Sequence, residues 1–183
     1  MKFLKWLLSM VVIAFIGLVL VGFMLPREIS ASRTALIATS VDRVFTEIAT
    51  PKSAKDWLPV GALDAKTVYE FSGPETGNDA AMKWSNPEFR DYGRGKLTVV
   101  QAHPNDRIEY SLDLEKMGTA QMRFELAEDG VSTRLTWTVS TMLGHSPFGR
   151  WFGLLLDDWF AEDIEGGLAG LKAKLEATPA AGS

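Results

Sequence analysis

The chain has 183 residues, no cysteine and a formal net charge of −4, from 23 acidic and 19 basic residues. Without cysteine, disulfides, thiolate catalysis and thiolate-bound zinc or iron–sulfur centres are excluded. The weakly acidic balance and the lack of any Lys/Arg cluster argue against nucleic acid as a partner. After the N-terminal apolar run, roughly 150 to 160 residues remain, enough for one domain with its own core.

The N-terminus predicts a membrane anchor. Between Lys5 and Arg27 lies an uncharged segment, residues 6–26, whose one polar side chain is Ser9. A helix needs about 20 such residues to cross the hydrocarbon core of a bilayer. A removed signal peptide is the alternative. It would have a shorter apolar region and a small-residue cleavage site, which the residues after Pro26 do not supply, so an uncut anchor is preferred.

The orientation of this anchor follows only weakly from charge, because Lys2 and Lys5 precede it whereas Arg27, Arg33 and Arg43 follow it. The short charged head favours a cytoplasmic N-terminus. The rest of the chain would then lie outside the cytoplasm, in the periplasm if the source is bacterial. We predict a single-pass membrane protein with an anchor at 1–26, a domain at 27–178 and a disordered tail at 179–183.

The first elements after the anchor are a strand, a short helix and a loop. Residues 29–38 are compatible with a strand, and Ser40 offers an N-cap for a helix over 41–49 with one apolar face. Proline and glycine then interrupt the pattern, and Trp57 is expected to pin the resulting loop.

From about residue 62 the apolar period becomes two, which is typical of strands with one buried face. Gly118 and the turn-forming segments 104–106 and 128–130 separate successive strands. With the first strand, we predict about seven antiparallel strands, the others lying near 64–71, 81–85, 95–102, 108–115, 121–126 and 131–139.

The last element is predicted to be a long amphipathic helix. Ser146 and Pro147 suit an N-cap and a first turn, and apolar side chains then recur at spacings of four and three through Leu175. A helix of about 30 residues is roughly 45 Å long, enough to cover one face of a curved sheet. The predicted class is α+β: a curved antiparallel sheet of about seven strands around a long C-terminal helix, preceded by one transmembrane helix.

Four short motifs, together with this order of elements, resemble the helix-grip fold of the START-related polyketide cyclase/dehydrase superfamily, also called SRPBCC proteins. Residues 41–45 resemble its first helix, 105–110 its P-x-x-R-I-x-Y strand start, 133–137 its T-x-[VL]-x-W strand, and 166–172 its G-L-x-x-L-K helix end. The likeness spans about 29–175. It implies a deep, mainly apolar cavity between helix and sheet. Members include lipid carriers, hormone receptors and aromatase/cyclases, so the resemblance indicates a fold better than an activity.

The residue types used in catalysis and metal binding form no clear constellation. His103 and His145 lie in predicted turns far apart, and no phosphate-binding, nucleophile-elbow or His-Glu-x-x-His motif occurs. We predict no catalytic residue, no metal and no cofactor. An acidic run in the last helix is expected to form a solvated face; it comprises Asp157, Asp158, Glu162, Asp163 and Glu165.

Aromatic residues are the candidate ligand-binding groups. Either they form an ordinary aromatic core, or they line a pocket for an apolar ligand, with Tyr69 or Tyr110 as a polar handle. The candidates are Trp57, Tyr69, Trp84, Tyr110, Trp137, Phe152 and Trp159.

The leading hypothesis is non-catalytic binding of a lipid or other hydrophobic small molecule near a membrane. The alternatives are a cyclase/dehydrase-type enzyme, which would need an acid/base pair in the cavity, and a protein-interaction module of an envelope complex.

Overall fold

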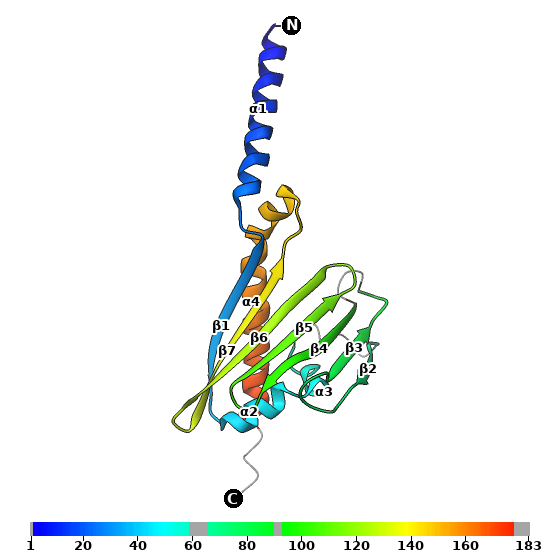
Figure 1. Ribbon diagram of the computed structural model, residues 1–183, viewed down its shortest axis with the longest axis vertical. Helices are drawn as coiled ribbons and strands as arrows, with labels where there is room; N and C mark the ends of the chain where they lie inside the picture. Colours follow the sequence, from blue (N-terminus) through cyan, green and yellow to red (C-terminus); the bar gives the residue numbers. More distant parts are fainter. Residues whose placement is uncertain (1, 59–65, 90–92, 178–183) are drawn as a thin grey trace, which may run out of the picture.

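A computed structural model describes residues 2–58, 66–89 and 93–177, without the side chains of residues 2, 4, 152 and 154–159 (Figure 1). The predicted tail at 179–183 lies outside the described residues. The elements are α1 (Lys2–Met24), β1 (Glu28–Ile37), α2 (Val41–Ile48), α3 (Pro51–Ala54), β2 (Val68–Ser72), β3 (Ala81–Ser85), β4 (Arg94–His103), β5 (Arg107–Leu114), β6 (Gly118–Asp129), β7 (Ser132–Met142) and α4 (Pro147–Ala177).

Helix α1 projects from one end of the domain, and its side chains are almost all exposed (Figure 1). Its segment Lys5–Met24, 20 residues long, is apolar and long enough to cross a membrane. A signal sequence near an N-terminus passes the same test of length and composition. The structure therefore confirms the predicted apolar helix.

The seven described strands form one antiparallel sheet in the order β1-β7-β6-β5-β4-β3-β2. Strands β2 to β7 follow one another as neighbours, as hairpin connections require. Strand β1 closes the order by pairing with β7, from Glu28 opposite Met142 to Ile37 opposite Thr133. Helix α4 runs along one face of this curved sheet (Figure 1). The predicted helix-grip architecture is confirmed.

An aromatic cluster forms the centre of the core between α4 and the sheet. Phe124 of β6 is fully buried, and its ring centroid lies 5.0 Å from that of Trp137 and 5.8 Å from that of Trp57. Trp57 meets Trp137 edge-on at 5.9 Å. The prediction that Trp57 pins its loop is confirmed, because this side chain is 4% exposed.

Two local predictions were wrong. Val131 was predicted to begin the strand near 131–139, but it lies in the β6–β7 turn, β7 begins at Ser132, and Val131 is 91% exposed. Thr133 takes the inward position and donates a hydrogen bond to the carbonyl of Thr39 at 2.8 Å, so a polar residue fits the buried face. The segment after α2, expected to be a loop, contains the short helix α3, with Pro51 at its first turn.

Candidate ligand cavity

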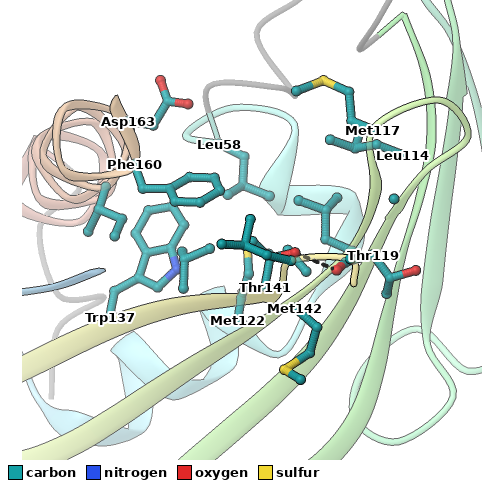
Figure 2. A pocket seen from close by; sticks show the side chains of 17 residues that line it. Leu58, Leu114, Met117, Thr119, Met122, Trp137, Thr141, Met142, Phe160 and Asp163 are labelled. Carbon is teal, nitrogen blue, oxygen red and sulfur yellow. Dashed lines mark hydrogen bonds between the residues drawn. The ribbon is translucent and has the colours of Figure 1, made fainter. Parts of the chain in front are cut away.

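A cavity of about 270 Å³ lies between α4 and one end of the sheet (Figure 2). Its walls come from the β5–β6 hairpin, the last residues of β7, the chain after α3, and α4. The lining residues are Leu58, Leu112, Leu114, Met117, Gly118, Thr119, Ala120, Met122, Trp137, Val139, Thr141, Met142, Leu143, Gly144, Phe160, Asp163 and Ile164.

The lining is mainly apolar and includes flexible side chains. Met117, Met122 and Met142 contribute thioether side chains, which adapt to ligands of irregular shape. The hydroxyl of Thr141 donates to the carbonyl of Thr119 at 2.9 Å, so this polar group is already satisfied (Figure 2). Such a surface suits an apolar molecule with few polar atoms.

Asp163 is the one titratable side chain among the described residues that line the cavity. It is half-buried, so it departs from the solvated face expected for its acidic run. Burial raises the pKa of the Asp163 carboxyl above its ordinary value, and the neighbouring Glu162 carboxylate adds to the rise. Its neighbour Glu165 lies outside the cavity and pairs with Arg33 at 2.7 Å.

Replacing Asp163 with asparagine should change how stability depends on pH. Because folding raises the pKa of this acid, its contribution to stability is fully present below the ordinary value of 3.8 and is lost as pH rises through the raised value. Asp163→Asn should therefore unfold at higher urea concentration than wild type at neutral pH, with the advantage vanishing below 3.8. Urea titrations of the detergent-solubilised chain measure this difference. Glu165→Gln on the same helix is the control, and a pH-independent difference would contradict the assignment.

Of the aromatic residues predicted to bind a ligand, Trp137 lines the cavity. Trp57 stands behind it, in edge contact with the Trp137 ring. The indole nitrogens of both are buried and have no hydrogen-bond partner, so neither ring is held in place by a polar contact. Trp137 therefore belongs both to the cavity wall and to the aromatic core.

The other described candidates lie away from the cavity lining. Tyr110 is buried, and its hydroxyl donates to the carbonyl of Ile48, which ties β5 to α2 rather than providing a polar handle. Trp84 is buried in β3 against Gly95, where a Cβ atom would lie 2.4 Å from the Trp84 ring. Tyr69 is opposite Trp84 on β2 and is half-buried. The side chains of Phe152 and Trp159 lie outside the described part of the chain.

Sequence reasoning missed the methionines and the small residues at the cavity's end. Met117 and Met142 lie at strand ends, where the alternation of apolar and polar residues stops being informative. A usable signal was present: Met117 lies in the β5–β6 turn, Met122 near the start of β6 and Met142 at the end of β7, and methionine is common at adaptable apolar surfaces.

We looked for clusters of metal-ligating side chains among the residues that the structure describes. No group of three or more His, Asp or Glu side chains there lies close enough together to hold a metal ion.

This geometry, a curved sheet gripping a long helix with an apolar cavity between them, defines the helix-grip class. A family model described as polyketide cyclase / dehydrase and lipid transport matches residues 28–176. The chain belongs to this family, as its SRPBCC-like motifs predicted.

Solved structures share the fold at low sequence identity. Norcoclaurine synthase from Thalictrum flavum, a point mutant in complex with a transition-state analogue, has a TM-score of 0.62 and 10% identity, with 82% of this chain and 95% of that chain covered. Protein MLL2253 from Mesorhizobium loti has a TM-score of 0.61 and 13% identity, covering 83% and 100%. The Aha1 dimer from Colwellia psychrerythraea has a TM-score of 0.54 and 17% identity, covering 83% and 99%. No curated protein sequence matches significantly.

Proposed function

We propose that this chain is a membrane-tethered, non-catalytic binding protein for a lipid or another hydrophobic small molecule. The observation that carries the proposal is the apolar cavity of about 270 Å³ between α4 and the sheet. Cavities near this size bind small organic ligands mainly through apolar contact, with a few polar groups that orient them. The family, whose description includes lipid transport, is consistent with that role.

The tether forms the second half of the proposal. Helix α1 acts as an uncut anchor, residues 27–178 form the ligand-binding domain, and the domain faces away from the cytoplasm. An anchored cavity meets membrane-dissolved molecules at high effective concentration. A topology reporter fused after Ser183 tests the orientation, and reporter activity in the cytoplasm would overturn it.

The enzyme alternative is less well supported. General acid–base chemistry needs at least one positioned group of suitable pKa, and commonly a pair. Asp163 supplies one such group, with no second titratable side chain among the described lining residues.

The proposed site is tested by filling it. Ala120 lines the cavity on β6, and Gln121 is the next residue, exposed on the opposite face of the same strand. Ala120→Phe should weaken binding of a dansylated fatty acid by about tenfold or more, because the phenyl ring occupies ligand space. Fluorescence titration of the detergent-solubilised full chain measures the affinity, and native mass spectrometry of the same sample identifies any co-purified molecule.

Gln121→Phe is the matched control, since it adds the same ring on the outer face and should leave binding unchanged. If Ala120→Phe and Gln121→Phe bound the dansylated fatty acid with equal affinity, the probe would bind outside this cavity, which would contradict the proposed site.

A further inference from the structure

The end of α1 is joined to the start of α4 by a buried arginine. The Arg150 side chain is 3% exposed, and its Nη1 donates to the carbonyls of Phe23 at 2.6 Å and Leu25 at 3.3 Å. Its guanidinium carbon also lies 5.6 Å from the centre of the Phe23 ring. The last carbonyls of a helix have no hydrogen-bond donor within the helix and carry partial negative charge. A guanidinium group there donates the missing hydrogen bonds and offsets the negative charge.

The first turn of α4 lies beside α1 itself. A Cβ atom on Gly22 would be 2.8 Å from the Cβ of Pro147, so glycine permits this close approach. Trp151 donates from its indole nitrogen to the carbonyl of Leu18 at 3.0 Å, and the Phe148 ring centroid lies 6.0 Å from that of Phe15.

The two helices run in the same direction (Figure 1). Side chains point toward the N-terminus of their own helix, so those of Phe148 and Trp151 reach back along α1. Phe15 precedes Gly22 by roughly 10 Å along the axis at 1.5 Å per residue. If α1 spans the bilayer, the first turn of α4 enters its interface, and these two aromatic side chains point deeper.

The cavity lies at this same end of the domain. Met142 is opposite Glu28, the first residue of β1, and the amide of Leu143 donates to the carbonyl of Arg27 at 2.7 Å. Thr141 is opposite Ala120 near the start of β6, so the β5–β6 turn that carries Met117 is also at this end.

Three large apolar side chains at this end are exposed. Met117 is 47%, Met142 is 69% and Phe148 is 51% exposed, and the two methionines also line the cavity. We call Met117, Met142 and Phe148 the bilayer rim. Large apolar side chains exposed at one end of a domain, beside an apolar helix, are consistent with a surface that is covered in use.

We propose that the bilayer rim rests in the lipid interface, so that the cavity opens directly onto the membrane and exchanges its ligand with the bilayer without passage through water. The proposal deepens the proposed function and rests on its membrane tether. The occupant of the rim is the phospholipid surface rather than a protein, because Phe148 contacts Phe15 on the exposed apolar surface of α1 and the two methionines lie at the same end of the domain, where α1 ends. Arg150 holds the cavity in that orientation.

The lack of native cysteine allows single-site labelling. Met117→Cys, Met142→Cys and Val131→Cys, each carrying an environment-sensitive nitrobenzoxadiazole dye, would be reconstituted as full chains into phosphatidylcholine–phosphatidylglycerol vesicles containing doxyl-labelled lipid. Val131 is the matched control, since it is exposed in the hairpin at the opposite end of the sheet, and β7, with 11 residues, is roughly 35 Å long. We expect a large loss of fluorescence at Met117 and Met142 and little at Val131.

Equal, weak quenching at all three sites in protein that resists alkaline extraction would overturn the bilayer rim while leaving the tether intact. Release of the protein from vesicles by alkali would overturn both. Dansylated fatty acid binding, measured separately, reports on the cavity, so a failure of ligand binding is distinguishable from a failure of membrane contact.

Discussion

Replacing Phe124 with alanine is expected to lower the free energy of unfolding by about 3–5 kcal/mol. The side chain is fully buried at the centre of the aromatic cluster, where its ring packs against those of Trp137, Trp57 and Tyr110 at centroid distances of 5.0, 5.8 and 6.1 Å. The loss combines the transfer of the ring from the core with a void that three rigid rings cannot close. Since small domains have about 5–15 kcal/mol of stability, the variant should be close to unfolding at room temperature.

Urea titration followed by tryptophan fluorescence measures the change. Phe71→Ala is the control, because Phe71 lies on the edge strand β2 and is 46% exposed, so its removal should cost less than about 1 kcal/mol. Comparable losses in the two variants would show that the aromatic cluster is not the centre of stability. Because Phe124 supports Trp137 from behind the cavity wall, Phe124→Ala should also weaken ligand binding.

Replacing Arg150 with methionine is expected to free α1 from the domain. Methionine retains an apolar stem but leaves the carbonyls of Phe23 and Leu25 without the guanidinium. Hydrogen bonds to charged groups contribute about 1.5–3 kcal/mol, which corresponds to a shift of roughly 10- to 150-fold in the ratio of docked to undocked α1. Pulsed electron spin resonance between labels at Val12 on α1 and Gln121 on β6 should show a broadened distance distribution.

Arg134→Met is the matched control for this experiment. Arg134 is exposed and bonds Asp129 near the distal hairpin, so its removal should leave the distribution narrow. Quenching of the dye at Met142 should fall in Arg150→Met if this side chain orients the cavity toward the lipid. An unchanged distance distribution would mean that the contacts of Gly22 and Trp151 suffice to hold α1.

Sequence periodicity predicted the helices and strands well wherever buried positions recur at a regular spacing. Alternation located β5, β6 and most of β7, and the spacing of four and three located α4, whose Ile164, Leu168, Leu171 and Leu175 are buried as expected. It failed at Val131, because a two-residue period says which positions face inward but not where a hairpin ends the strand. Valine is apolar and was assigned to the strand, yet it lies in the turn and is exposed to solvent.

The sequence predicted the type of site, an apolar cavity between helix and sheet, but only some of the residues that line it. Trp137 lines the cavity, but Tyr110 and Trp84 are core residues, because burial alone does not say whether an aromatic ring faces a neighbour or an empty space. Asp163 and Met117 border the cavity although one was assigned to a solvated face and the other to no site. Which side chains surround a void depends on how α4 crosses the sheet.

The sequence by itself determined the apolar N-terminal helix, the α+β class, the succession of strands along the chain and the family, because these depend on local periodicity and short-range motifs. The tertiary structure alone decided where the cavity lies and at which end of the domain it is found. Both depend on contacts between residues more than a hundred positions apart, such as the side chain of Arg150 and the carbonyl of Phe23, or the paired residues Glu28 and Met142. No local pattern encodes such contacts, since they arise only when the sheet closes and α4 packs across it.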